Sequence, residues 1–324
     1  MKLEALFSDH AVLQRGKEIN IFGKGKGVVE ITFCGNTASY TSDGGDFVLT
    51  LPPLQAGGPY EMTVCLNGKT HIIKDIMVGD VILVAGQSNT EVQIGEISPE
   101  MTGDNPYIRA YHCRHISKSH PFDDSWNALT GDNTSHWNAL PYHIADMLYK
   151  ERGVPIGVVC CSQGAARIQS FLSPQLNTGF DFDPEKLHPD YKYPQFVAFN
   201  HNSDIFRFML EPIVPYTIDK VVWYQGESNT SVYEGNHYDE MLKAMIGEWR
   251  RLFRNAKLPF VIVQINDFTG AFSAQGWKLV QQAQERVAQE TQYCTLVKIS
   301  DLGQHDLIHP TNKKEVAQRI FAEL

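Results

Sequence analysis

The sequence predicts an α/β protein in which a three-layer α/β/α domain with a parallel sheet, residues 76–324, follows a small N-terminal β-sandwich, residues 1–75. Three observations predict this fold class. The chain has 324 residues, which is enough for one large domain or two. Its first part carries short β-branched and aromatic runs bounded by glycine and proline. Its second part alternates apolar runs with helical patterns.

Turn signals divide the N-terminal part at intervals of about 8–12 residues, a spacing typical of a small sandwich. The expected strands are Ile19–Phe22, Val28–Phe33, Phe47–Leu51, Tyr60–Val64 and His71–Ile76. The link from Asp75 to Asp80 is short and lacks the Gly/Ser-rich composition of a flexible tether. We therefore expect the sandwich to pack on the second domain as a fixed support.

Beyond residue 75 the apolar runs are continuous, as in parallel strands that are covered on both faces. The expected strands are Asp80–Ala85, Tyr107–Tyr111, Ile156–Cys161, Lys220–Tyr224, Phe260–Ile265 and Thr295–Ile299. Apolar residues at helical spacing predict helices that include Trp137–Leu148, Tyr238–Leu252 and Val316–Leu324. Ligands of such sheets bind beyond the carboxyl ends of the strands, so the residues that follow each strand are the candidates for a site.

Composition limits the classes of binding partner and the cellular compartment that we expect. The net charge is −9 and no Lys/Arg-rich run occurs, so we expect no nucleic-acid partner. No stretch approaches about 18 consecutive apolar residues, so no membrane span is expected. The six cysteines lack metal or redox spacing. The N-terminus also lacks the apolar core of a secretory signal, which favours a cytoplasmic protein, and the oligomeric state stays open.

The histidines give no metal-binding pattern. His112 and His115 lie three residues apart without an acid nearby in the sequence, and we interpret them as part of a polar loop. We accordingly expect neither a metal nor an organic cofactor.

Ser88 directly follows the first apolar strand of the second domain, in the segment Gly86-Gln87-Ser88-Asn89. A serine in a tight turn at a strand end can act as a nucleophile. Thr90 stands where the α/β-hydrolase elbow has its second glycine, so that motif is absent. The competing interpretation is a serine that caps the following helix.

The last expected strand is followed by the segment Asp306-Leu307-Ile308-His309-Pro310. An aspartate three residues before a histidine can hold the imidazole Nδ1–H and leave Nε2 free to take a proton from a serine. A turn that carries a surface histidine is the competing interpretation.

Two further strand ends carry polar residues. Gln225, Glu227 and Asn229 follow the fourth strand of the second domain, and Gly164 follows the third. A side-chain amide or a backbone N–H at these places could stabilise an oxyanion. For each segment taken alone, a polar loop is the alternative.

Together these segments resemble the SGNH hydrolase superfamily, and within it the sialate O-acetylesterase-like carbohydrate esterases. Blocks typical of that group stand at Gly79–Val81, Gly86–Asn89, Trp223–Asn229 (WYQGESN) and His309–Lys313 (HPTNK). The segment Phe7–Gly16 also resembles the opening of the family's sandwich, so the likeness runs over almost the whole chain.

The sequence departs from the family pattern in three places. Ala165 stands where members often have a second glycine, and Thr90 stands where they often have methionine. Many members carry an acid two residues before the histidine, where this chain has Leu307 and places Asp306 one residue earlier. The departures leave the nucleophile and the base in place and concern the triad acid and the shape of the pocket.

The resemblance implies a serine esterase that removes O-acetyl groups from carbohydrates through an acetyl-serine intermediate, without a cofactor. It assigns Ser88 as the nucleophile and His309 as the base. The acid would be Asp306 or, as in some related acetylesterases, Glu227.

The resemblance also implies an oxyanion hole and a substrate class. Backbone N–H groups of Ser88 and Gly164, with an amide of Asn229 or Gln225, would hold the oxyanion. The substrate would be an O-acetylated sugar, such as sialic acid or an acetylated oligosaccharide. Arg167 could contact the carboxylate of a sialic acid, and a solvated arginine is the alternative.

Two other functions stay open from the sequence. One is a carbohydrate-binding protein whose esterase domain is degenerate. The other is a lipase-like SGNH esterase, which the absence of a long apolar lid-like segment disfavours.

Overall fold

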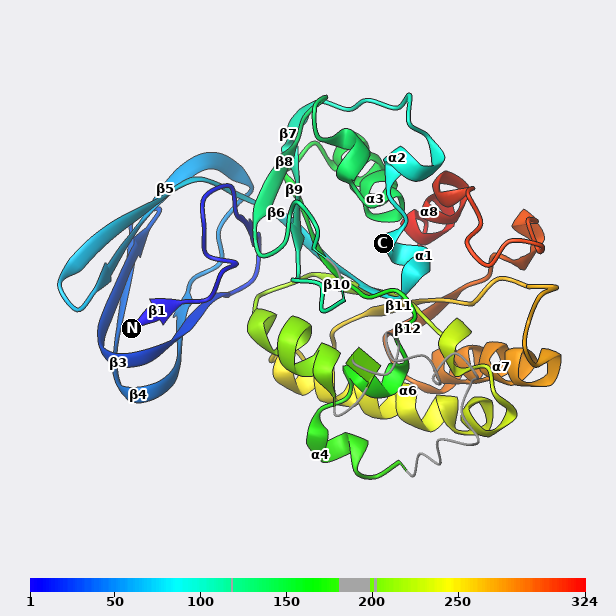
Figure 1. Ribbon diagram of the computed structural model, residues 1–324. Coiled ribbons are helices and arrows are strands. Elements are labelled where there is room, and N and C mark those ends of the chain that lie inside the picture. The colour runs from blue at the N-terminus through cyan, green and yellow to red at the C-terminus, as the bar shows by residue number, and fades with distance from the viewer. Residues whose placement is uncertain (118, 181–198, 201–202) are drawn as a thin grey trace.

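Two ladders of strands that share one long strand form the framework of the molecule (Figure 1). The computed structural model describes residues 1–117, 119–180, 199–200 and 203–324. In this part of the chain, no helix combines the length and the apolar character that crossing a membrane requires.

The N-terminal strands form a mainly antiparallel ladder. Its members are β1 (Lys2–Leu3), β2 (Val12–Gln14), β3 (Ile19–Phe33), β4 (Asn36–Leu51), β5 (Gly57–Leu66) and the first half of β6 (Lys69–Gly86). The sequence predicts two strands where β3 is one, because glycines interrupt it. The pairing of β3 with β4 continues past a bulge between Lys24 and Lys26, so the glycines bend the strand without ending it.

β6 carries the chain from the first ladder into the second. The sequence predicts two strands here with a domain boundary near Asp75, whereas the structure joins them in one strand, Lys69–Gly86. Its first half pairs with β5 and its second half with the central sheet. Asp75 lies inside this strand with a φ of 54°. The expected boundary therefore coincides with a local irregularity in a strand and not with a linker.

The second ladder is a mixed sheet in the order β8-β7-β9-β6-β10-β11-β12. Its further strands are β7 (Asn105–His112), β8 (Trp126–Leu129), β9 (Ile156–Ser162), β10 (Lys220–Tyr224), β11 (Phe260–Val263) and β12 (Cys294–Val297). Neighbours run parallel except β7 and β8, which corrects the prediction of a parallel sheet at this edge. β8 has only four residues, two of them partly exposed, and so lacks a strand-like apolar run.

Helices lie on both sides of the central sheet (Figure 1). The α-helices whose bounds lie in the described residues are α1 (Ser88–Glu91), α2 (Ile94–Ile97), α3 (Ala139–Arg152), α4 (Pro174–Asn177), α6 (Val232–Leu252), α7 (Ala274–Glu290) and α8 (Lys313–Phe321). Short 3₁₀ or π turns are η1 (Thr134–His136), η2 (Ile168–Phe171), η5 (Phe206–Leu210), η6 (Glu211–Ile213), η7 (Glu227–Asn229) and η8 (Ser300–Leu302). α3 contacts α8 on one side of the sheet, and α6 contacts α7 on the other.

The three predicted helices correspond to α3, α6 and α8. The sequence predicts no helix at α7. The buried face of α7 mixes Trp277 and Val280 with Gln281 and Gln284, which weakens the apolar periodicity.

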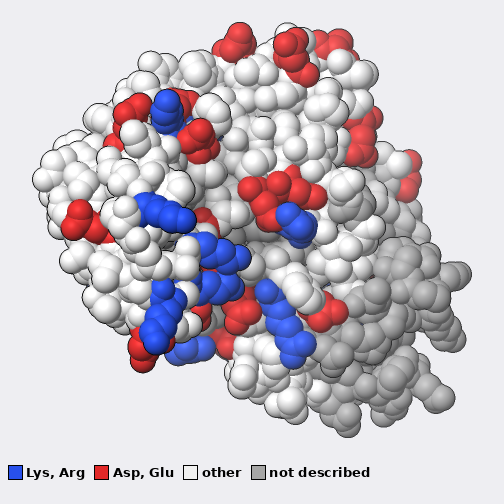
Figure 2. Space-filling view, turned by 60° about the vertical axis from the view of Figure 1, so that its left-hand side comes forward, with Lys and Arg blue, Asp and Glu red and all other residues white. Residues whose placement is uncertain are grey.

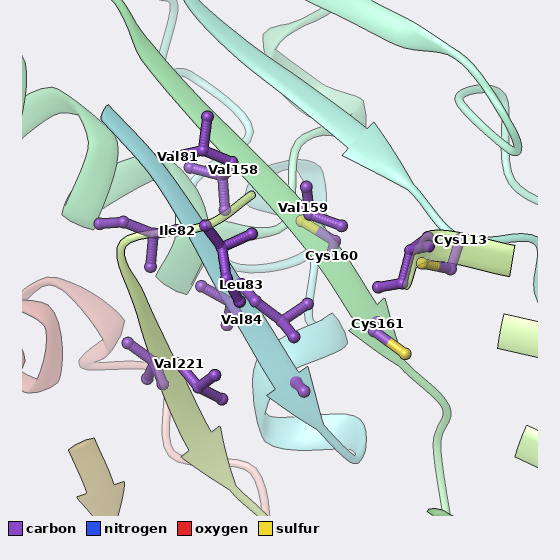
Figure 3. Packing of buried hydrophobic residues seen from close by; sticks show 14 of the residues in the cluster. Val81, Ile82, Leu83, Val84, Cys113, Val158, Val159, Cys160, Cys161 and Val221 are labelled. Atoms are coloured by element: carbon purple, nitrogen blue, oxygen red, sulfur yellow. The ribbon is translucent and has the colours of Figure 1, made fainter. Parts of the chain in front are cut away.

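The core centres on β6 and its two neighbours (Figure 3). The β6 residues Val81–Val84 are fully buried, and they lie beside Val158–Cys161 of β9 and Val221 of β10. Such continuous apolar runs are expected for strands covered on both faces. All six cysteines of the chain are free thiols. This packed centre gives a firm platform to the residues that follow the three strands.

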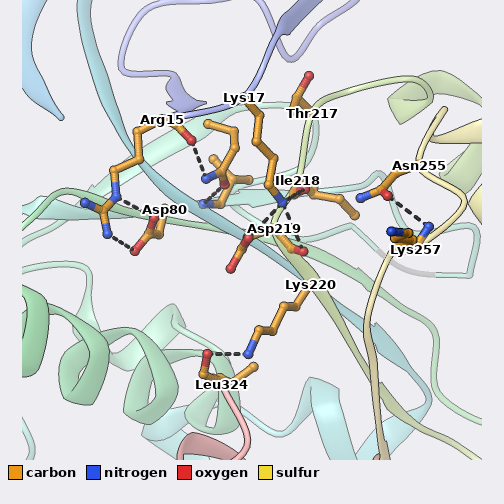
Figure 4. A network of polar contacts seen from close by, with 12 residues as sticks. Arg15, Lys17, Asp80, Thr217, Ile218, Asp219, Lys220, Asn255, Lys257 and Leu324 are labelled. Atoms are coloured by element: carbon orange, nitrogen blue, oxygen red, sulfur yellow. Dashed lines mark hydrogen bonds and ion pairs between the residues drawn. The ribbon is translucent and has the colours of Figure 1, made fainter. Parts of the chain in front are cut away.

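Polar contacts join the N-terminal ladder to the α/β part (Figure 4). Arg15 donates to the two carboxylate oxygens of Asp80 over 2.7 and 3.0 Å. Lys17 Nζ donates to Oδ1 of Asp219 over 2.8 Å. Charged pairs thus bind the two parts to one another.

Elsewhere on the surface, Figure 2 shows a face on which lysines and arginines lie among aspartates and glutamates.

Candidate active site

Three adjacent strands bring candidate residues to one edge of the sheet. β9, β6 and β10 are neighbours and run parallel, so their carboxyl ends lie together. Ser88, Gly164 and Gln225 follow these strands. The chain leaves β6 at Gly86, whose φ is +153° and where a Cβ would lie 2.0 Å from the carbonyl oxygen of Tyr224. Only glycine fits this turn, which sets Ser88 at the start of α1.

Ser88 and His309 form the central pair of the site. The Oγ of Ser88 lies 2.8 Å from Nε2 of His309, across a sequence separation of 221 residues. Ser88 is half-buried and His309 is exposed, so the pair can be reached from solvent. The helix-cap interpretation of Ser88 is wrong, because Gln87 holds the N-cap position of α1 and no side chain caps it.

The charge state of His309 suits a base. Partial desolvation of the ring and the positive charge of Lys313 hold the pKa of His309 below its usual value, while Glu96 and Glu91 act in the opposite direction. Only the neutral imidazole can accept a proton from Ser88. A lowered pKa therefore keeps the competent form populated into more acidic solution.

Two backbone N–H groups lie next to the nucleophile. Within the described residues, neither the N–H of Ser88 nor that of Gly164 forms a hydrogen bond. A Cβ on Gly164 would lie 3.9 Å from Cβ of Ser88 and 2.9 Å from Oε2 of Glu91. The absence of a side chain at Gly164 therefore leaves room for the carboxylate of Glu91, and the β9 loop lies in van der Waals range of Ser88. Donors of this kind can bind an oxygen on which negative charge develops.

Glu91 belongs to a buried polar group behind α1. Nε2 of His115 lies 2.8 Å from Oε1 of Glu91, and its Nδ1 lies 3.1 Å from Oδ1 of Asp123. Burial alone would lower the pKa of His115, but the two carboxylates raise it. The interpretation of His112 and His115 as a polar loop without acids is wrong. Both are buried, and the ring of His112 stacks on that of His120 with centroids 4.3 Å apart.

The amides of Gln225 and Asn229 are fully buried and bonded within the protein. Nε2 of Gln225 donates to Oε1 of Gln87 over 3.1 Å and to Oδ1 of Asn229 over 2.8 Å. Nδ2 of Asn229 donates to Oε1 of Gln169 over 2.7 Å and to Oε1 of Glu234 over 3.1 Å. These amides tie the strand-end loops together. A role as oxyanion donors would require these bonds to break.

Arg167 is buried beside a carboxylate of the protein. Its Nε and Nη2 donate to Oε1 of Glu234 over 3.0 and 2.8 Å. The same oxygen accepts Nε2 of Gln169 over 3.2 Å. The alternative of a solvated arginine is therefore wrong, since Arg167 is 5% exposed.

Neither candidate acid contacts His309 directly. Among the described residues, Asp306 is exposed and bonded to no other group, and Nδ1 of His309 forms no hydrogen bond. Glu227 is buried, which raises its pKa, and its Oε1 accepts Nδ2 of Asn89 over 2.6 Å. Nδ2 of Asn89 also donates to the carbonyl oxygen of Ile308 over 3.0 Å. Glu227 is thus linked to the histidine loop through Asn89.

Lys313 completes the polar group around Asn89. Its Nζ donates to Oδ1 of Asn89 over 2.6 Å, and the side chain is 1% exposed. Burial lowers the pKa of Lys313 to about 7.

Sequence reasoning misses Glu91, Glu234 and Lys313 as members of the site. Glu234 has a readable signal, because Ser231-x-x-Glu is the sequence pattern of a helix start, and Oγ of Ser231 both accepts the N–H of Glu234 and donates to its Oε2 over 2.9 Å. Lys313 has none, because a lysine in a polar segment is normally exposed.

The match to a family model covers residues 78–321, and that family is described as carbohydrate esterase, sialic acid-specific acetylesterase. Human sialate O-acetylesterase is 26% identical over an alignment of 311 residues, which covers 85% of this chain and 59% of the relative. The mouse sialate O-acetylesterase is 24% identical over 330 residues, with 82% of this chain and 60% of the relative covered. The chain thus spans about three fifths of the length of these relatives.

A solved structure of a carbohydrate acetylesterase from Xanthomonas citri has the same overall fold. Its TM-score is 0.84 at 27% identity, and the match covers 99% of this chain and 73% of that one. The likeness therefore includes both ladders of strands. Because the family model matches well over half of the chain and spans both Ser88 and His309, the chain belongs to the sialic acid-specific acetylesterase family of carbohydrate esterases.

Proposed function

We propose that this protein is a carboxylic ester hydrolase that removes O-acetyl groups from carbohydrates through an acetyl-serine intermediate. The observation that carries the proposal is the 2.8 Å contact between Oγ of Ser88 and Nε2 of His309 at the carboxyl edge of the sheet. Family membership supports the acetyl ester as the bond that is cleaved. The same proposal assigns the α/β part to the SGNH type of three-layer fold and the N-terminal strands to a supporting sandwich.

In the first half-reaction, Nε2 of His309 takes the proton of Ser88 as Oγ attacks the acetyl carbonyl carbon. Negative charge develops on the carbonyl oxygen, and the N–H groups of Ser88 and Gly164 are the donors beside it. The bond to the sugar oxygen then breaks. The imidazolium of His309 gives its proton to that oxygen, so the sugar leaves with a free hydroxyl group.

In the second half-reaction, His309 takes a proton from water, and the resulting hydroxide attacks the acetyl group on Ser88. The same two N–H groups hold the oxyanion. Collapse of the intermediate releases acetate, and His309 returns the proton to Oγ of Ser88. Every step uses side chains or backbone groups of this chain.

For the substrate we propose an O-acetylated sugar, with acetylated sialic acid the first to be tried because relatives are named for sialate. Acetate release should be measured from O-acetylated sialic acid, from acetylated xylo- and manno-oligosaccharides, and from p-nitrophenyl acetate. A long-chain p-nitrophenyl ester is the comparison. We expect turnover of at least one sugar ester and little turnover of the long chain.

Preference for the long-chain ester would contradict the carbohydrate assignment and favour a lipase-like enzyme. Sugar binding without acetate release would contradict the esterase assignment itself.

A further inference from the structure

We propose that Lys313 is a positioning residue for the base: it locks Asn89 between the nucleophile turn and the His309 loop, and it places a buried positive charge beside that loop. The inference rests on the proposed function only in taking His309 as the base. None of the expected catalytic roles includes this lysine.

Asn89 is the junction between three segments of the site. Its Nδ2 donates to Oε1 of Glu227 over 2.6 Å and to the carbonyl oxygen of Ile308 over 3.0 Å. Its Oδ1 accepts Nζ of Lys313 over 2.6 Å. Every partner matches the donor or acceptor character of the amide atom that faces it, so the amide has one favourable orientation. Asn89 follows Ser88 directly and Ile308 precedes His309 directly, so this amide sets the two reacting groups relative to one another.

The burial of Lys313 needs such an explanation. A lysine is almost never fully buried unless it is paired with an opposite charge. Lys313 is 1% exposed, and within the described residues no carboxylate contacts its Nζ directly. Glu227 acts on the charge of Lys313 and is linked to it through Asn89. Holding a cation in such a place is costly, and the interactions that offset the cost are the bond to Asn89, the nearby ring of Tyr224 and the charge of Glu227.

Charged groups face His309 from several elements. Desolvation is the largest cause that lowers the pKa of His309, and Lys313 at the start of α8 is the second. Glu96 of α2 and Glu91 of α1 raise this pKa, but the net effect is a lowering.

Other titratable groups face α8. The ring of Tyr224 lies 5.9 Å from Nζ of Lys313, and Glu227 acts on the same lysine. Two other residues of α8 act on His143 of α3: Lys314 lowers the pKa of His143 and Glu315 raises it. Asp306 lies on the histidine loop itself. In this set, Lys313 is the cation that acts on His309.

The variants Lys313→Met and Lys313→Gln separate the two roles. Methionine removes both the charge and the hydrogen bond, whereas glutamine keeps an N–H donor for Asn89 and removes the charge. Lys314→Met is the matched control, because it removes the same charge from the next residue, which is exposed. Folding is checked by circular dichroism.

Two readouts are taken for each protein. The first is the pH profile of kcat/KM with p-nitrophenyl acetate. The second is the titration of the His309 ring by NMR, with its signal assigned from a His309→Asn protein. The NMR titration needs no activity, so it tests the link to Lys313 even if Ser88 proves not to be the nucleophile.

Loss of the charge should raise the pKa of His309, so the acid limb of kcat/KM should move to higher pH in both Lys313 variants. We expect the acid limb to move by at least half a pH unit, which corresponds to a loss of about threefold in kcat/KM at pH values below the limb. On the plateau, kcat should fall further in Lys313→Met than in Lys313→Gln, because only glutamine keeps a donor for Asn89, and KM should change little in either. Lys314→Met should match wild type throughout.

An unchanged His309 titration in folded Lys313→Gln would overturn the proposal. So would an equal shift in Lys314→Met, because the effect would then be that of any nearby surface charge. Should Lys313→Met fail to fold, Lys313→Gln alone decides.

Discussion

A single nitrogen atom, Nδ1 of His309, poses the main question at the scale of the residue. An acceptor at Nδ1 fixes the tautomer in which Nε2 can take the Ser88 proton. Asp306 lies on the same loop and Glu227 lies behind Asn89, yet neither reaches Nδ1. The carboxylate of Glu227 is already bound by Asn89, whereas that of Asp306 is exposed and unbound within the described residues. Hydrogen bonds of this type are often long in free enzymes and tighten when substrate binds.

We therefore expect Asp306→Asn to lower kcat by orders of magnitude with little loss of stability, because it removes the acceptor that orients His309. Glu227→Gln should lower kcat less and should cost stability, because it weakens the buried bonds around Asn89. Comparing kcat and thermal unfolding of the two variants checks this. Asp132→Asn, which changes an exposed carboxyl in a surface turn, is the control. A larger kcat loss in Glu227→Gln than in Asp306→Asn would assign the acid to Glu227.

Site residues can be predicted from the sequence when their position follows from the neighbouring strand or helix. Ser88 follows a strand, and the HP block that holds His309 precedes a helix, so both can be read from spacing. The contacts of Gln225, Asn229 and Arg167 depend on which loops meet in space. The sequence shows polar residues at these positions, but it does not show that their donors are used up by Glu234 and Gln87.

Between elements, the carboxylate of Glu234 joins α6 to the loops that follow β9 and β10. Its Oε1 receives Arg167 from the β9 loop and Asn229 from the β10 loop. The presence of a buried ion pair says little about overall stability, but removal of one of its members is usually strongly destabilising. The loops beside Gly164 should therefore depend on Arg167 for their position.

We expect Arg167→Ala to lower the free energy of unfolding by about 3–5 kcal/mol, the usual cost of removing one member of a buried ion pair. Activity should fall to a similar extent for all acetyl esters, because the loops move as a unit. Urea unfolding and a comparison of sialate and neutral sugar esters check this. Arg254→Ala, an exposed arginine, is the control. Unchanged stability with loss of sialate turnover alone would instead make Arg167 a substrate contact.

Element prediction succeeded where an apolar run stands alone and failed where two elements merge. β10 has the predicted bounds, Lys220–Tyr224, because five apolar or amphipathic residues are bounded by polar ones. β6 does not, because the strand passes from one ladder to the other at Asp75 without a turn or a linker, and the change of pattern there marks only a change of surroundings. β8 is missed because its pairing with β7 comes from tertiary contact and not from periodicity.

The whole molecule contains two ladders that are tightly joined. Besides the charged pairs of Figure 4, Nε1 of Trp126 donates to the carbonyl oxygen of Leu6 over 2.9 Å. The hydroxyl of Tyr216 donates to the carbonyl oxygen of Val12 over 2.7 Å. The ring of Phe7 lies 5.5 Å from that of Tyr216. With β6 common to both ladders, neither can unfold without exposing the core of the other.

We expect calorimetry to show one cooperative unfolding transition for the whole chain, and Tyr216→Phe to lower its midpoint without splitting it. Loss of the bond to Val12 leaves a buried carbonyl oxygen without its donor, at a cost of about 1–3 kcal/mol. Two separate transitions in the unaltered protein would show that the N-terminal ladder folds as an independent domain.

The central claim of this account is that Ser88 is the nucleophile, and the most direct test is kcat for Ser88→Ala with p-nitrophenyl acetate. Ser125→Ala, which changes a serine in the turn before β8, is the control. We predict a loss of several orders of magnitude in Ser88→Ala, as in other serine enzymes whose nucleophile is removed, with unchanged circular dichroism. Activity within about tenfold of wild type in the folded variant would contradict the claim, because a loss that small is far below the cost of removing a nucleophile.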